Sequence, residues 1–62
     1  KMQLFHFYIR DTIYDIQASD AGKAMEYANR NIVDQLGLHP MAWEDMPGLA
    51  NSYYLKTGDF FS

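Results

Sequence analysis

Two largely apolar stretches near the N-terminus predict the strands of a β-hairpin. Residues 3–9 and 12–17 are rich in aromatic and β-branched types, which favour strands. A two-residue turn at Arg10-Asp11 gives a self-consistent register, although a longer loop stays open because these are not the residues that tight turns prefer. One face then holds the pairs Ile9/Thr12, Phe7/Tyr14 and Phe5/Ile16, and the other holds Tyr8/Ile13, His6/Asp15 and Leu4/Gln17.

Apolar residues recur every three or four positions between residues 19 and 37, which predicts an amphipathic helix. We expect Ser19 or Asp20 to cap its N-terminus, Gly37 to end it, and Leu38 to supply the apolar contact that accompanies such an end. The expected buried stripe consists of Ala21, Ala24, Met25, Ala28, Ile32 and Leu36. Because half of these side chains are those of alanine, the helix can lie close to a sheet of large aromatic residues.

The pattern after the helix is weaker. Trp43 and Met41 are expected to close one edge of the core. Residues 52–56 predict a third strand, and Phe60-Phe61 is a candidate for a short fourth strand. The order β-β-α-β predicts a single α+β domain over residues 1–62, with a small antiparallel sheet and one helix packed on one of its faces.

Composition makes this domain marginal in stability. A chain of 62 residues buries only about 60% of its unfolded surface. Burial is expected to contribute ~95 kcal/mol at ~25 cal/mol per Å² of apolar surface, whereas ordering the chain costs ~93 kcal/mol at ~1.5 kcal/mol per residue. The chain has no cysteine for a disulfide, and its two histidines are too few for a histidine-only metal site. We expect no cofactor, which leaves a partner chain as the stabilising element.

The sheet face without a helix is the candidate interaction surface, because large apolar side chains are expected where a solvated face would be polar. The candidate partner interface comprises Leu4, His6, Tyr8, Ile13, Asp15, Tyr53 and Tyr54. The third strand contributes either Tyr53 and Leu55 or else Tyr54. The candidate acidic contacts to a basic target surface are Asp11, Glu44 and Asp45. Alternatively, the Phe60-Phe61 segment covers this face, or its apolar groups are ordinary scattered exposure.

Candidate catalytic chemistry is sparse. His6 and Asp15 form a carboxylate–imidazole pair of the kind found in catalytic and metal sites, but we favour an ordinary cross-strand polar pair. Glu44 and Asp45 would point in opposite directions on a strand and so make a poor acid–base pair. His39 is expected to interact with the last carbonyl groups of the helix. Since no motif places a nucleophile, we predict that the protein is not an enzyme.

The net charge and the N-terminal segment argue against several classes of function. A net charge of −3 argues against nonspecific nucleic-acid binding, although single-strand binding through Tyr53 and Tyr54 stays a third, salt-dependent hypothesis. No apolar run is long enough to span a membrane, and the N-terminal segment lacks the pattern of a signal peptide. Lys1 precedes Met2, which we expect to be the natural first residue. The expected location is the cytoplasm of a host cell.

The segment from Tyr14 to Ala24 resembles a step seen in many short bacteriophage accessory proteins, some of which look like anti-CRISPR and other anti-defence inhibitors. In this step a strand is followed by Ala-Ser, an acidic cap and an alanine-rich helix. The resemblance covers residues 3–38 and concerns the fold pattern, so it transfers no catalytic residue. It implies inhibition by binding, and the weak net charge favours occlusion of a surface over mimicry of nucleic acid.

The functional hypothesis is therefore a small phage or mobile-element protein. It would bind a host protein complex that acts in defence or in nucleic-acid processing. It would inhibit that complex by covering part of its surface. The alternative is a homodimeric structural or regulatory protein, such as a toxin–antitoxin partner or a transcriptional accessory. That alternative places Leu4, Tyr8 and Ile13 at the centre of the dimer.

Overall fold

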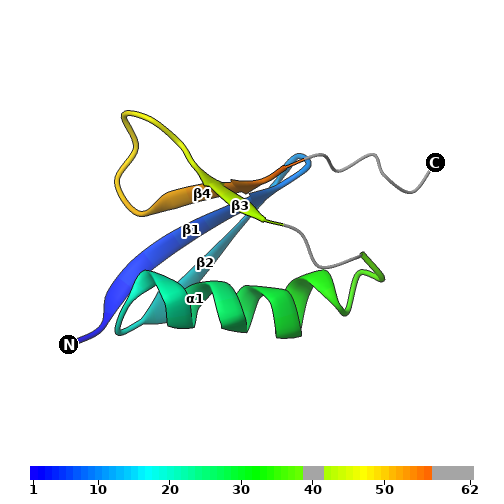
Figure 1. Ribbon diagram of the computed structural model, residues 1–62, viewed down its shortest axis with the longest axis horizontal. Coiled ribbons are helices and arrows are strands. Elements are labelled where there is room, and N and C mark those ends of the chain that lie inside the picture. The colour runs from blue at the N-terminus through cyan, green and yellow to red at the C-terminus, as the bar shows by residue number, and fades with distance from the viewer. Residues whose placement is uncertain (39–41, 57–62) are drawn as a thin grey trace.

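The computed structural model describes residues 1–38 and 42–56 (Figure 1). Within them the chain forms β1 (Gln3–Ile9), β2 (Thr12–Ala18), α1 (Ala21–Ala28), the π-helical turn η1 (Asn29–Val33), β3 (Trp43–Asp45) and β4 (Ser52–Leu55). The strands form one sheet in the order β2-β1-β4-β3. Because α1 packs on one face of this sheet, the α+β fold predicted from the sequence is confirmed.

The predicted hairpin is confirmed together with its register. β1 and β2 pair antiparallel along their whole length, from Gln3 opposite Ala18 to Ile9 opposite Thr12. The connection is the two-residue turn, in which Arg10 has a φ of 57°. This left-handed conformation matches the twist of a tight hairpin, although glycine or asparagine adopts it more readily. On the helix side, the buried residues of the two strands are Phe5, Phe7, Ile9, Ile16 and Ala18.

The sheet is mixed, whereas an antiparallel sheet was expected. β4 pairs parallel to β1, with Phe7 opposite Tyr53, and β3 pairs antiparallel to β4, with Trp43 opposite Leu55. The reason is a chain reversal that the sequence pattern does not show. The three-residue strand β3 precedes β4, so the β3–β4 hairpin turns β4 into the direction of β1. The expected short strand at Phe60-Phe61 lies outside the described residues.

Both ends of the helical segment carry the predicted caps. The Oδ1 atom of Asp20 accepts a hydrogen bond from the backbone N–H of Lys23 at 2.9 Å, so Asp20 is the N-cap. Gly37 has a φ of 77°, and the N–H of Leu38 donates to the carbonyl oxygen of Val33 at 3.0 Å. This six-to-one hydrogen bond after a left-handed glycine is the Schellman ending, and the buried side chain of Leu38 completes it.

A π-helical turn interrupts the helix after α1. The N–H of Asp34 donates to the carbonyl oxygen of Asn29 at 3.0 Å, five residues back instead of four. The buried face therefore advances from Ala24 to Ala28 by four residues and then to Val33 by five. All three side chains have no exposed surface.

The π turn explains where the expected stripe is wrong. Ile32 is half-buried and still packs against the core, as Met25 does, whereas Leu36, which was expected to be buried, is 49% exposed. One extra residue in the turn rotates everything after it by the angle of one residue, which moves Val33 inward and Leu36 outward. A search for a 3.6-residue period cannot reveal such an insertion.

The core is a cluster of aromatic rings between the sheet and the alanines of α1. Phe7 lies at its centre with no exposed surface. Its ring meets that of Trp43 edge-on, with 4.8 Å between centroids, and stacks against that of Tyr53 at 5.6 Å. Trp43 packs against both halves of the core, as expected. Met41, its expected companion, lies outside the described residues.

Candidate interaction surface on the open sheet face

The sheet face that α1 does not cover is called the open face below. Side chains alternate between the two faces along each strand, so every second residue lies here. The open face comprises Leu4, His6 and Tyr8 of β1, Ile13, Asp15 and Gln17 of β2, Ser52 and Tyr54 of β4, and Glu44 of β3. The strand register arranges these side chains in rows that cross the sheet.

One row crosses all four strands and is mainly apolar. Ile13 lies opposite Tyr8, Tyr8 opposite Tyr54, and Tyr54 opposite Glu44. Ile13 is 55% exposed and Tyr54 is 37% exposed, while Tyr8 is half-buried between them. Leu4, on the same face of β1, is 44% exposed. The structure thus places large apolar side chains together on the face that the helix leaves uncovered.

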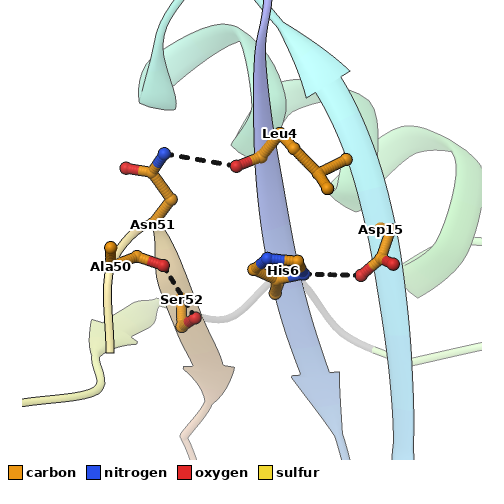
Figure 2. Close-up of polar contacts among 6 residues, drawn as sticks. All are labelled: Leu4, His6, Asp15, Ala50, Asn51 and Ser52. Carbon is orange, nitrogen blue, oxygen red and sulfur yellow. Dashed lines mark hydrogen bonds and ion pairs between the residues drawn. The ribbon is translucent and has the colours of Figure 1, made fainter. Parts of the chain in front are cut away.

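A polar row of Asp15, His6 and Ser52 lies beside it (Figure 2). The Nδ1 atom of His6 lies 2.7 Å from the Oδ1 atom of Asp15, so a ring N–H donates to the carboxylate. Ser52 lies opposite His6 on β4, which completes the residue types of a charge-relay site. However, Ser52 is buried and its hydroxyl donates to the carbonyl oxygen of Ala50 at 3.0 Å. Activation of a serine requires a hydroxyl that donates to the histidine, so the row is better described as a polar stripe.

Asn51 holds the polar row in place. Its backbone has a φ of 52°, which asparagine tolerates better than most residues. Its side-chain Nδ2 donates to the carbonyl oxygen of Leu4 at 3.2 Å (Figure 2). Its own carbonyl oxygen accepts from the N–H of His6 at 2.8 Å. These bonds join the start of β4 to β1. Sequence reasoning identified neither Asn51 nor Ser52, and an asparagine just before a strand was the only signal for the first.

Glu44, at the β3 end of the apolar row, interacts with two residues of its own chain. The hydroxyl of Tyr54 donates to its Oε1 atom at 3.1 Å, and the ammonium of Lys56 lies 2.9 Å from its Oε2 atom. The hydrogen bond from Lys56, followed by that from Tyr54, lowers the pKa of Glu44 below its usual range. The hydrogen bond to Glu44 raises the pKa of Tyr54 and likewise that of Lys56. The ammonium of Lys56 therefore offsets the charge of the Glu44 carboxylate within the chain.

These shifts predict a pH window for the Glu44 contacts. The lowered pKa of Glu44 means that its contribution to stability is present above the unfolded carboxyl's pKa and is lost as pH falls through the folded value. The raised pKa values of Tyr54 and Lys56 mean that their contributions to stability are present below their unfolded pKa values and are lost as pH rises through the folded ones.

The Glu44→Gln variant should lower the pKa of Tyr54, measured by NMR titration of its ring. The Asp45→Asn variant is the control and should leave that titration unchanged, whereas identical curves for all three proteins would contradict the assignment.

Tyr53 does not belong to the open face, so its place in the predicted interface is wrong. Its ring stacks against Phe7 on the helix side and lies 6.5 Å, centroid to centroid, from Phe5. Leu55 is buried on the same side, which leaves Tyr54 as the tyrosine of β4 on the open face. Because the two tyrosines point to opposite faces, they do not form a joint stacking platform for single-stranded nucleic acid.

The two other acidic candidates lie away from the apolar row. Asp11 is exposed in the β1–β2 turn. Asp45 is exposed on the outer strand β3 opposite Tyr53, so its side chain leaves the sheet on the helix side. Of the three predicted acidic contacts, only Glu44 is on the open face.

Residues 1–38 and 42–56 contain no group of three or more histidine, cysteine, aspartate or glutamate side chains that could hold a metal ion. The helices in these ranges are too short and too polar to cross a membrane. Comparisons with protein-family models, with curated proteins and with solved structures found no match.

Proposed function

We propose that this domain binds another protein through its open face and acts by covering part of that protein's surface. The observation that carries the proposal is the row of Ile13, Tyr8 and Tyr54, with Leu4 on the same face. A sheet face in contact with water normally presents polar side chains. Apolar side chains gathered on one face and bordered by polar groups are typical of protein interaction sites.

The tyrosine side chains of the apolar row are already held in place, so binding a partner would cost them little conformational entropy. Tyr8 is held between Ile13 and Tyr54, and Tyr54 is anchored by its hydrogen bond to Glu44. Tyrosines that are already ordered lose little conformational freedom on binding, and they are favoured at the energetic centres of interfaces. The His6–Asp15 pair borders the row and offers hydrogen bonds around it. The proposal assigns no catalytic role to any of these residues.

In its narrower form, the proposal identifies the chain as a phage or mobile-element inhibitor. Its partner would be a host protein complex of defence or nucleic-acid processing. The fold-pattern resemblance of residues 3–38 supports this form. The net charge of −3 also suits a basic, nucleic-acid-facing surface on the partner and would speed the encounter. Since Lys56 offsets the charge of Glu44, Asp11 and Asp45 are the predicted acidic contacts that remain for that attraction.

Two exposed leucines allow a matched test. Leu4 on the open face is 44% exposed, and Leu36 beyond the π turn is 49% exposed. Each is replaced in turn by the photo-reactive residue p-benzoylphenylalanine, and the protein is irradiated in cells of a bacterial host. We expect position 4 to form a cross-link to one defined host protein and position 36 to form none.

The Ile13→Lys variant is the control for the same face. Its side chain is exposed, so the fold should persist by circular dichroism while the cross-link from position 4 disappears. Equal cross-linking from positions 4 and 36 would refute the proposal, as would no cross-link from position 4. A nuclease-sensitive product would indicate a nucleic-acid partner instead.

A further inference from the structure

The two outer strands of the sheet differ in how they are protected. β3 has three residues, two of them acidic, and Pro47 follows it, so short length, charge and proline all discourage further strand pairing. β2 has seven residues without proline, glycine or lysine, and it pairs with β1 without a bulge. Among residues 1–38 and 42–56, no strand pairs with the outer side of β2. Such an edge is a template for another strand.

The hydrogen bonds show which backbone groups of β2 point outward. The N–H of His6 donates to Asn51, so His6 directs its backbone groups toward β4 and away from β2. Asp15, opposite His6, therefore directs its own N–H and C=O to the outer side, as do Ile13 and Gln17 two residues away. Side chains are closest at such non-hydrogen-bonded pairs, which agrees with the 2.7 Å contact between His6 and Asp15.

We infer that the outer edge of β2 pairs antiparallel with β2 of a second copy of this chain, about a two-fold axis at Ile16. Charge and side-chain complementarity select this register. A two-fold axis at Asp15 would let all seven residues of β2 pair with the second copy. It would also place the two Asp15 carboxylates directly opposite each other, which is destabilising. Centring the pair on Tyr14 would place Asp15 against Ile13 of the second copy, whose side chain offers the carboxylate no hydrogen-bond donor.

The register centred on Ile16 satisfies each position. Asp15 lies opposite Gln17 of the second copy, whose amide donates to the carboxylate. On the helix side, Ile16 meets its own counterpart and the large Tyr14 lies opposite the small Ala18 of the second copy. The two Asp15/Gln17 pairs each exchange two backbone hydrogen bonds. The second copy is thus the occupant that this strand fits.

The dimer supplies the stabilising partner that a cysteine-free chain of 62 residues otherwise lacks. It also joins the two open faces into one continuous surface, because both copies contribute to the same extended sheet. This pairing uses the edge of β2 and not the open face, so it holds whatever protein the open face binds.

Self-association of the purified chain tests the inference without any partner protein. Sedimentation velocity over the micromolar to millimolar range should show a reversible dimer. The Gln17→Pro variant removes an outward N–H that β1 does not use, and proline is tolerated on an edge strand, so the monomer should stay folded. Its dimerisation should weaken by about tenfold or more, equivalent to ~1.4 kcal/mol. The matched Gln17→Ala variant keeps the N–H and should lose much less.

Amide hydrogen exchange provides a second readout. In the wild-type chain, the N–H groups of Asp15 and Gln17 should exchange more slowly as concentration rises, while those of Tyr14 and Ile16 are protected at every concentration by β1. A chain that stays monomeric over the whole range would overturn the inference. So would a dimer that Gln17→Pro leaves intact, or one in which the N–H groups of Asp15 and Gln17 exchange rapidly.

Discussion

Replacing Phe7 with alanine is expected to unfold the domain at room temperature. Phe7 has no exposed surface and contacts the rings of both Trp43 and Tyr53. Truncation of a buried phenylalanine to alanine costs ~3–5 kcal/mol. The single core of a domain this small supplies about the same amount, so little stability should remain. Circular dichroism and the dispersion of the amide NMR spectrum measure the loss directly.

Two further variants show whether the loss of stability comes from the missing core volume at position 7. Phe7→Leu keeps most of the apolar volume and should still unfold cooperatively in urea, with a free energy of unfolding lower by about 1–2 kcal/mol. Leu4→Ala removes an exposed apolar side chain from the same strand and should change that free energy by no more than about 0.5 kcal/mol. If Phe7→Ala instead unfolds cooperatively with nearly wild-type stability, Phe7 is not the centre of the core.

Ala28→Leu is expected to destabilise the domain by about 2–3 kcal/mol, although leucine forms helices almost as well as alanine. Ala28 has no exposed surface and belongs to the same buried cluster as Phe5 and Phe7. Three additional carbon atoms at this point would force the helix away from the sheet. The free energy of unfolding in urea measures the effect.

The control places the same residue on the opposite side of the helix. Glu26 is exposed, so Glu26→Leu should change stability by about 0.5 kcal/mol or less. An equal loss in both variants would mean that leucine harms the helix itself. Equal and negligible effects would mean that α1 does not rest on the sheet through its alanines.

The hairpin and the caps were accessible from sequence because their signals are local. A two-residue turn leaves one register, and it pairs the face of Phe5, Phe7 and Ile9 with the β2 face that contains Ile16. The structure has that register. Asp20 and Gly37 act through backbone groups only a few residues away. In such cases the residue types alone determine the geometry.

The remaining features depend on contacts between distant segments. Three residues are too few for β3 to show a strand pattern, yet this strand reverses the chain and makes β4 parallel to β1. The π turn adds one residue where periodicity assumes none. In each case tertiary packing overrides the local pattern.

Among the candidate interface residues, some were assigned by a local signal and others depend on contacts between distant segments. Leu4, Tyr8 and Ile13 could be assigned to one face because the hairpin register is local. Tyr53 and Tyr54 are equally good strand residues, and only the pairing of β4 with β1 decides which of them faces the helix.

The central position of β1 has a consequence for the time course of folding. β1 is the first of the described strands to be synthesised, yet it lies inside the sheet, and its second neighbour, β4, is the last. Closing so long a loop carries an entropic cost before the new contacts form, and such non-local pairing slows folding. While the chain is still being synthesised, the hairpin and helix can therefore dock only provisionally. We expect cooperative folding to begin once Leu55 has left the ribosome.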